Sequence, residues 1–503
     1  MKNKKIIILL VILLVGFFAR IGPVNKPLLG NFSSYQAATA IIGRFIAREG
    51  PEALLYPKTN FLIYGQPALH MLYVPGAAFA GGMLWKVFSF SLDFWGRFQA
   101  SFFTMLSALL IYLIIRGYYG EKTGLLSCFI FNVFPLSFVY GQSFMNEAFA
   151  FFCVICSFWI LSNFKITMRS ILFSGIFAAA SFLMRIHFLC VLPALVFVLW
   201  QRSGKNKFSN TAVFIIAVFI PVISWYLHTY NVASSMDSNI TSIFAQKGKH
   251  YGSFPHPLLL NIEFYKYVID SLGGICLNPA GFVFMIIGLA IFRPENKIEW
   301  FIILWLLGSL GIVVLLPQKI YDHNFYFYPI LFPAALLISN VAIKILKGKG
   351  TAVKVFLGVV FIAISARYFI NPAFSYPAEM STVLDAGRFI RENTPADARI
   401  IVSPDVYDQL YYCDRYGWTF DVKDDSRSGN YFDVEWLKLL INCRIRDGAD
   451  FYVSADLRSI NNLPEFVEYL DKNYENISPD ERFVVYVLTE PACSAGRKEK
   501  LNE

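Results

Sequence analysis

The fold is decided at residues 354–393, which read KVFLGVVFIAISARYFINPAFSYPAEMSTVLDAGRFIREN. The first half is apolar enough to lie in lipid, whereas the second half ends in an amphipathic helix of the soluble kind. Upstream, from Met1 to about Arg367, apolar runs follow one another, and most gaps between them carry Lys or Arg. The stretch therefore predicts a many-pass helical membrane body at residues 1–371 and a small soluble α/β domain at residues 372–503.

Composition supports this division. Mean hydropathy is +0.51, and 56% of the 503 residues are hydrophobic. Only 16% are charged, against roughly 25% in soluble domains, which excludes a purely soluble protein. The net charge of +9 is explained by Lys and Arg at cytoplasmic loop ends, so we expect membrane lipids and no nucleic acid as partners.

The apolar stretches can be counted and oriented. They lie at residues 6–22, 70–87, 97–115, 122–140, 147–163, 170–184, 187–200, 212–229, 277–292, 299–317, 325–343 and 353–371. If all of them crossed, the basic loops from Arg116–Lys122 to Lys344–Lys354 would lie outside, against the positive-inside bias. If 70–87, which contains Pro75 and Gly76, stays at the surface, these loops all face the cytoplasm. The sequence thus predicts about eleven spans plus interfacial helices.

The N-terminus completes the predicted topology. MKNKK precedes an apolar run without a small-residue cleavage site, which favours a retained first span with a cytoplasmic N-terminus. The first outer loop at 23–96, the loop at 230–276 and the soluble domain then share the outer side. We expect a multi-pass protein of a bacterial cell membrane, because the loops are short and no retention signal is present.

The soluble domain alternates helices with short apolar strands. Residues 386–405 predict a helix, a turn and a strand, and residues 436–455 repeat the pattern. No glycine-rich phosphate loop accompanies them, which argues against a nucleotide site and favours a structural or substrate-guiding cap. The eight cysteines are scattered, and a disulfide in this domain is left open.

A helix is predicted in the first outer loop at SSYQAATAIIGRFIAREG, residues 33–50. Tyr35 belongs to its apolar side, and Arg44 and Arg48 lie one turn apart. Such an arginine pair suits a lipid phosphate. Snorkelling arginines that anchor an interfacial helix are the alternative interpretation.

The order of several loose motifs carries a resemblance to a known family. The motifs are GNFSSYQAATAIIGRFIAREGPEALLYP after the first span, QPAL, FWGRFQASFFTMLSALLIYLI, YGQSFMNEAFAFF, MRIHFLCVLPAL and HNFYFYPILFPAALL. The chain resembles polytopic GT-C glycosyltransferases of the protein O-mannosyltransferase and aminoarabinose-transferase type. The resemblance implies transfer of a sugar from a polyprenyl-phosphate donor to a lipid, glycan or protein acceptor on the outer face.

The family also implies an acidic base in the first outer loop and a second acidic residue in the next outer turn. The second matches Glu147, directly after Asn146. The first falls on Asn31, which cannot accept a proton at neutral pH. Glu147 is one candidate base, Glu49 or Glu52 another, and a weak or inactive member is the third interpretation. A solvated helix N-terminus is the simpler interpretation of Glu147.

Two further groups are candidate substrate-binding residues. Arg185 and His187 flank a short outer turn, where polar side chains are costly unless they face a cavity. Lys319, His323 and Tyr326 precede the 325–343 stretch, where the family places residues near the lipid phosphate. A snorkelling pair and a structural histidine are the alternatives.

No metal-ligand spacing is evident, so we expect no cofactor, although a divalent cation at Glu147 is left open. A second functional hypothesis is a catalytically degenerate scaffold or substrate-binding subunit, which Asn31 favours. A third is a transporter or flippase of lipid-linked sugars, which typically shows internal repeats that are not seen here. Were the first hypothesis correct, Asn31, Glu147, Arg185 and His323 should converge in one pocket.

Overall fold

The computed structural model describes residues 2–235, 240–241, 256–374, 378–403, 407–419, 434–455, 457–461 and 463–488. The chain forms two compact units. The membrane unit comprises Met1–Lys26, Leu72–Ser235 and Ser242–Phe374, and the sheet unit comprises Pro27–Met71, Met236–Thr241 and Ser375–Glu503. The break before Ser375 lies near the predicted boundary, but most of the first outer loop groups with the C-terminal segment instead of the membrane body.

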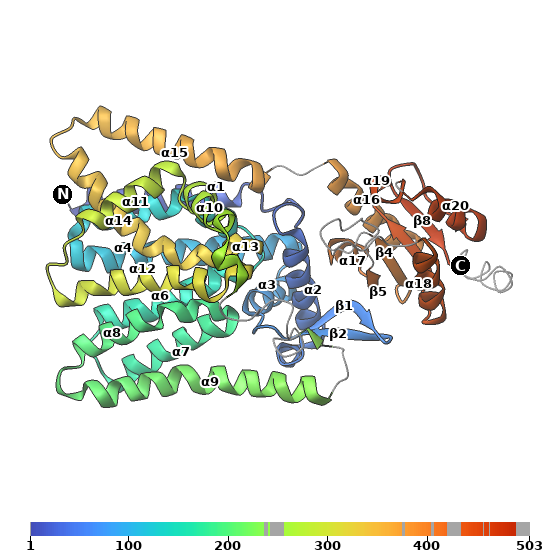
Figure 1. The fold of residues 1–503 in the computed structure, drawn as a ribbon, viewed down its shortest axis with the longest axis horizontal. Coiled ribbons are helices and arrows are strands. Elements are labelled where there is room, and N and C mark those ends of the chain that lie inside the picture. Colours follow the sequence, from blue (N-terminus) through green and yellow to red (C-terminus); the bar gives the residue numbers. More distant parts are fainter. Residues whose placement is uncertain are drawn as a thin grey trace. The chain divides into compact units, whose positions relative to one another are not determined.

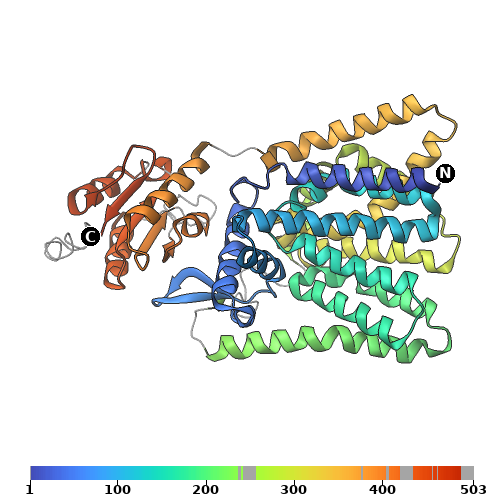
Figure 2. The same ribbon diagram turned by 180° about the vertical axis from the view of Figure 1, so that it is seen from behind.

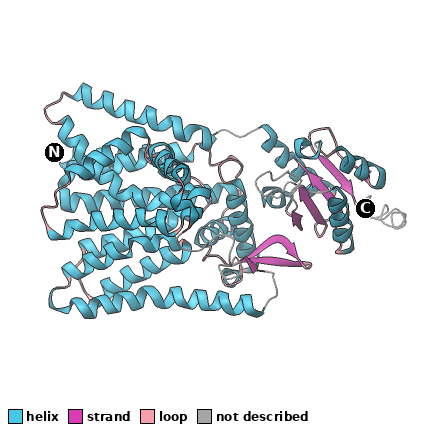
Figure 3. Ribbon diagram, in the orientation of Figure 1, coloured by secondary structure: helices cyan, strands magenta, loops and turns pink. Residues whose placement is uncertain are grey.

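The membrane unit is helical (Figures 1 and 3). Its elements are α1 (Lys2–Ile21), α3 (Gly76–Val87), α4 (Leu92–Val133), α5 (Pro135–Tyr140), α6 (Glu147–Asn163), α7 (Met168–Met184), η2 (Ile186–Val191), α8 (Leu192–Arg202), η3 (Gly204–Asn206), α9 (Lys207–Ser235), η4 (Pro257–Leu260), α10 (Ile262–Ser271), η5 (Leu272–Cys276), α11 (Pro279–Ile291), η6 (Lys297–Trp300), α12 (Phe301–Leu315), α13 (Pro317–Asp322), η7 (Asn324–Ile330), α14 (Leu331–Leu346) and α15 (Thr351–Phe374). Every predicted apolar stretch overlaps with at least one of these helices.

Several of these helices can cross a bilayer. Among the described residues, five are long and apolar enough, or six if the bent pair α10–η5 and α11 is one broken span. Shorter apolar helices lie at Glu147–Asn163, Met168–Met184 and Ile186–Arg202. The chain is therefore a multi-pass integral membrane protein. Its α3 has only 12 residues, about 18 Å of helix, which is too short for a regular span.

Helix α4 is a hairpin of two helices. Gly120 inside it has φ 81° and ψ 171°, which no helix contains. A Cβ on Gly124 would lie 2.9 Å from the carbonyl oxygen of Tyr112, although a straight helix would separate these residues by roughly 18 Å. The hydroxyl of Tyr112 also donates to Glu121 at 2.6 Å. The chain therefore reverses at Gly120, where the sequence predicts a loop between two spans.

The long helices run side by side in both views (Figures 1 and 2). The N-terminus and the connections α8–α9 and α14–α15 lie at the same end of this bundle. These connections hold the basic segments Arg202–Lys207 and Lys344–Lys354. Their shared end agrees with the prediction that the basic loops face one side of the membrane.

The sheet unit combines three distant chain segments in one sheet. Its elements are α2 (Ser33–Glu49), η1 (Pro51–Leu54), β1 (Lys58–Ile63), β2 (Gln66–His70), β3 (Ile240–Thr241), α16 (Ala378–Asn393), β4 (Arg399–Ser403), α17 (Tyr407–Cys413), β5 (Tyr416–Thr419), α18 (Val434–Arg446), β6 (Phe451–Ser454), α19 (Leu457–Asn461), α20 (Pro464–Asn473), β7 (Glu475–Asn476) and β8 (Val484–Val487). The strand order is β3-β2-β1-β5-β4-β6-β8-β7. Strands β1, β5, β4 and β6 are parallel to one another, whereas β2, pairing with β1, and β8, pairing with β6, are antiparallel to these partners.

Helices cover both faces of the central strands, as the predicted α/β pattern requires. Ile401 and Tyr452 pack with residues of α18 and α20. Ile400 and Val402 pack with residues of α16 and α17. Because neighbouring residues of β4 are buried on opposite faces, its three central residues, Ile400, Ile401 and Val402, are all apolar.

The hairpin β1–β2 was not predicted, since only helices were expected in the first outer loop. Its two-residue turn is Tyr64-Gly65, with φ 49° and 74°, and Ile63 pairs with Gln66. Positive φ at both positions is the geometry of a type I′ turn, which normally begins with Asn, Asp or Gly. Tyr at the first position hides that signal in the sequence.

Candidate functional site

The candidate site of the membrane unit is built where two antiparallel helices begin and end. Glu147 is the first residue of α6, and Arg185 directly follows the last residue of α7. Nε of Arg185 lies 2.6 Å from Oε1 of Glu147. Glu147 is fully buried and Arg185 is 8% exposed. Charges are buried in this way only when paired, so the two residues form one unit.

The carboxylate has further capacity to bind. Oε1 of Glu147 faces Arg185, whereas Oε2 has no hydrogen-bond partner among the described residues. A buried acceptor without a hydrogen bond is unusual in a native protein and typically marks a ligand or water site. Because Glu147 is fully buried, it is not a solvated helix end, and its predicted catalytic role stays a prediction.

Asn146 holds this corner together through its side chain. Its Oδ1 accepts from the backbone N–H of Ala77 at 2.9 Å. Its Nδ2 donates to the carbonyl oxygens of Val74 and Met184, both at 3.3 Å. The predicted substrate-binding residue is thus engaged with the backbone before α3 and at the end of α7, and it fixes the residues beside Glu147 and Arg185.

Aromatic rings surround the guanidinium of Arg185. It lies over the ring of Tyr73 at 4.6 Å and over that of Phe325 at 5.1 Å. Such contacts stabilise a cation while leaving N–H groups available to an anion. The guanidinium of Arg185, which follows α7, therefore contacts one residue after β2, Tyr73, and one residue of η7, Phe325.

His187, His323 and Tyr326 join the same aromatic cluster. The ring of His187 lies 4.7 Å from that of Tyr326, and the ring of His323 lies 5.0 Å from that of Phe325. Nε2 of His187 is buried without a hydrogen-bond partner among the described residues. Of the four residues expected to converge, Glu147, Arg185 and His323 are therefore brought together within the membrane unit.

Lys319 and His323 are the first and last residues of the segment KIYDH, residues 319–323. Burial, and then the ammonium of Lys319, lower the pKa of His323 to about 4. Burial also lowers the pKa of Lys319, while Asp322 opposes this. His323 is consequently a neutral imidazole at physiological pH, able to donate or accept a hydrogen bond but not to supply charge.

The sequence did not point to Tyr73, which lies beside Arg185, nor to the buried Gln142 in the turn before α6. Tyr73 lies against Arg185, and Gln142 is 2% exposed with both side-chain polar atoms lacking partners among the described residues. Arg97 fixes the turn that carries Gln142 by donating to its carbonyl oxygen at 3.1 Å. The only sequence signal for Gln142 is its place in YGQSFMNE, shortly before Glu147.

The first-loop arginines lie in the sheet unit, where both contact one carboxylate. Nη1 of Arg44 lies 2.5 Å from Oδ1 of Asp414, and Nη2 of Arg48 lies 2.8 Å from Oδ2. Arg44 also stacks on the ring of Tyr411 at 4.4 Å and donates to its carbonyl oxygen. Burial alone would raise the pKa of Asp414, but the two arginines together lower it below its usual value. These contacts attach α2 to α17.

The remaining first-loop residues belong to the sheet unit as well. The carbonyl oxygen of Asn31 accepts from Gln36 at 2.9 Å. The ring of Tyr35 lies 6.1 Å from that of Phe32. Glu49, an alternative candidate base, is paired with Lys58 at 2.9 Å. The roles predicted for Asn31, Tyr35, Arg44 and Arg48 stay predictions.

Within the described ranges, no three His, Cys, Asp or Glu side chains lie close enough together to hold a metal ion. The expectation that the chain uses no cofactor stays a prediction.

Comparison with solved structures identifies the fold. ArnT from Cupriavidus metallidurans, bound to undecaprenyl phosphate, is similar with a TM-score of 0.64 at 11% identity, covering 97% of this chain and 99% of that chain. The fold is that of a GT-C membrane glycosyltransferase. The archaeal oligosaccharyltransferase AglB from Archaeoglobus fulgidus, in complex with an inhibitory peptide and a dolichol-phosphate, shares this GT-C fold with a TM-score of 0.55 at 11% identity, over 96% of this chain and 74% of that one.

Other comparisons agree with the GT-C fold. The mycobacterial arabinofuranosyltransferase AftD has a TM-score of 0.55 at 12% identity and covers 95% of this chain but 41% of its own. Residues 74–225 match the family of dolichyl-phosphate-mannose-protein mannosyltransferases. That segment contains both Glu147 and Arg185. A search of curated protein sequences found no match.

Proposed function

We propose that the chain is an integral membrane glycosyltransferase that moves a sugar from a polyprenyl-phosphate donor to a lipid, glycan or protein acceptor on the outer membrane face. The observation that carries this proposal is the buried pair of Glu147 and Arg185, 2.6 Å apart at adjacent helix ends of a GT-C fold. Relatives of that fold solved with undecaprenyl phosphate and with a dolichol-phosphate support a donor of this class.

Glu147 is the residue to which we assign proton transfer. Its carboxylate takes the proton of the acceptor hydroxyl while the oxygen forms a bond to the anomeric carbon of the sugar. The bond from that carbon to the phosphate oxygen breaks, and the phosphate leaves with the electron pair. Asn31 cannot take this proton, so it is assigned a hydrogen-bonding role only.

The leaving phosphate requires cations that are already in place. Arg185 has N–H groups in a fixed fork that matches phosphate oxygens, and the aromatic rings on its faces keep it oriented. Lys319 adds a second positive charge, and His187, His323 and Tyr326 can donate hydrogen bonds. Preorganised donors of this kind stabilise the charge that develops as the carrier phosphate departs.

We further propose about eleven spans, with the N-terminus in the cytoplasm and the C-terminal domain outside the cell. The turn before α6 and the end of α7 then face the outer side, where a lipid-linked sugar and its acceptor would meet. A degenerate scaffold is the second candidate function, and the replacement of the family's first-loop Asp by Asn31 is the observation that favours it.

The test uses the full-length protein in liposomes with a panel of radiolabelled undecaprenyl-phosphate sugars and a membrane extract as acceptor. Wild-type protein is expected to transfer label from one of them, and Glu147→Gln to lose activity by about 10²–10⁴-fold, the usual contribution of a general base. Glu49→Gln and Glu52→Gln, which alter the alternative bases, should retain activity.

Folding must be controlled because Glu147→Gln leaves the buried Arg185 without its partner, a change that costs about 3–5 kcal/mol. Each variant is therefore compared with wild type by thermal unfolding and by undecaprenyl-phosphate binding. A folded Glu147→Gln protein with full activity would refute the assignment. A wild-type protein that binds the carrier but transfers none of the sugars would favour the scaffold.

A further inference from the structure

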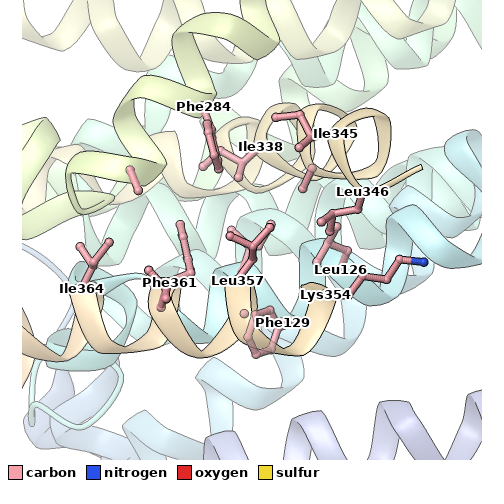
Figure 4. Close-up of a pocket in the computed structure, with 15 residues that line it drawn as sticks. Leu126, Phe129, Phe284, Ile338, Ile345, Leu346, Lys354, Leu357, Phe361 and Ile364 are labelled. Carbon is pink, nitrogen blue, oxygen red and sulfur yellow. The ribbon is translucent and has the colours of Figure 1, made fainter. Parts of the chain in front are cut away.

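A second feature of the membrane unit lies away from Glu147. It is a cavity of about 480 Å³ between the second half of α4, α11, α14 and α15 (Figure 4). Its walls are aliphatic and aromatic side chains, among them Phe129, Phe284, Leu357 and Phe361, and its one charged lining residue is Lys354. A cavity of this composition suits an alkyl chain and does not suit a sugar or a nucleotide.

The cavity exists because α15 packs loosely against its neighbours. Only 6% of the apolar part of this helix is buried. Gly358 lines the cavity, and a Cβ added there would have no atom within 4 Å. Leu357 is still 41% exposed beside it. The groove is thus open toward the lipid that surrounds the helices.

The polar end of the groove is strongly basic. Lys354 lies in the first turn of α15 and Lys344 in the last turn of α14, and the connection between them adds Lys347 and Lys349 without any acidic residue. All four lysines are exposed, and in the described part of the chain none has a carboxylate partner. Basic groups at the end of an apolar groove between membrane helices are typical of anionic lipid sites.

We propose that this groove binds one anionic phospholipid, with an acyl chain against Phe361 and Leu357 and its phosphate at Lys354. The occupant is distinct from the donor of the proposed reaction. The 16 residues of α14, roughly 24 Å of helix, separate its start beside η7 and His323 from its end beside the lysines. A headgroup at Lys354 therefore comes from the opposite leaflet to a donor at Glu147.

Native mass spectrometry of the full-length protein tests this assignment. The probes are dioleoyl phosphatidylglycerol, dioleoyl phosphatidylcholine and undecaprenyl phosphate. We expect the wild type to retain phosphatidylglycerol in preference to phosphatidylcholine. Lys354→Gln should weaken that binding about fivefold, the equivalent of ~1 kcal/mol per lysine near a headgroup.

A substitution that fills the groove tests the proposal independently of the lysine variant. Gly358→Leu adds a side chain where the structure has open space, so it should abolish retention of phosphatidylglycerol without disturbing the fold. Val359→Leu, on the neighbouring residue that is 56% exposed and does not line the cavity, is the matched control and should bind as wild type does.

Three outcomes would overturn the proposal. They are equal retention of the two phospholipids by wild type, unchanged binding by Gly358→Leu, and replacement of phosphatidylglycerol by undecaprenyl phosphate in a Lys354-dependent way. The last would assign the groove to the sugar carrier. Because binding is measured directly, failure of the glycosyltransferase assay does not affect the result.

Discussion

At the scale of single residues, buried carboxyl groups are used in two ways. Glu147 is fully buried and paired with Arg185. Asp408, in α17, is 4% exposed. Burial raises the pKa of Asp408 to about 6, although a hydrogen bond with Ser33 opposes the change. The first carboxylate is ion-paired within the membrane unit, whereas the second links α17 to the start of α2.

Asp408 predicts a pH dependence of stability. Between its ordinary pKa near 3.8 and the folded value near 6, the folded protein binds the proton more tightly than the unfolded chain. Stability therefore falls as pH rises through this window, by about 3 kcal/mol in all. Asp408→Asn should remove the penalty and raise the unfolding temperature by roughly 5–10 °C at pH 8, with little change at pH 4. Calorimetry of the full-length protein in detergent measures both.

The exposed Glu468→Gln in α20 is the control for this experiment and should leave both temperatures unchanged. An Asp408→Asn protein that unfolds at the wild-type temperature at pH 8 would show that the carboxyl is not held in an unfavourable environment.

At the scale of elements, close helix packing positions the residues around Arg185. A Cβ on Gly308 of α12 would lie 2.0 Å from the carbonyl oxygen of Cys190, so α12 contacts the backbone of η2 directly. That 3₁₀ turn carries His187 and follows Arg185. Contacts between α2 and α17 do the same for the sheet unit, where Arg44 and Arg48 share Asp414. The first contact is made by backbone atoms and the second by charged side chains.

The glycine at the α12–η2 contact gives a matched pair of variants. Gly308→Ala must displace backbone and should destabilise the protein by about 1–3 kcal/mol while lowering sugar transfer. Gly311→Ala, in the same helix, has no atom within 4 Å of the added Cβ and should be neutral or stabilising by about 0.5–1 kcal/mol. Unfolding temperature and transfer rate are measured for each. Equal behaviour of the two variants would remove the packing argument.

At the scale of the whole molecule, the chain returns twice to one sheet. Strands β1 and β2 come from the first outer loop, β3 follows α9, and the other strands come from the C-terminal segment. Whatever side of the membrane this sheet faces, all three segments share it, because they pair in a single sheet. Within the membrane unit, the basic connections α8–α9 and α14–α15 lie at the same end of the helical bundle.

The predicted topology can be tested by thiol labelling with an impermeant maleimide. Cys443 of α18 is exposed and should react in intact cells, with Cys443→Ser as the background control. A cysteine placed at the exposed Lys205 of the α8–α9 connection should react only after the membrane is permeabilised. The reverse pattern would place the sheet unit in the cytoplasm and contradict an extracellular site.

The sequence by itself determined the elements. The helix expected at residues 33–50 is observed at Ser33–Glu49, and the stretch expected at 147–163 is observed at Glu147–Asn163. Residues 386–405 hold the expected helix end and strand, α16 and β4. Apolar runs and charged turns are local properties, so they can be read without knowing the rest of the chain.

Only the tertiary structure decided the partners. The contacts of Arg44 and Arg48 with Asp414 span 370 and 366 residues, and the pairing of β1 with β5 joins Phe61 to Gly417. The contacts of Tyr73 with Arg185 and of Gln142 with Arg97 could not be recognised, because the residues next to them in the sequence carry no information about these partners. Which surfaces meet depends on how the whole chain packs, and no local pattern of residues contains that information.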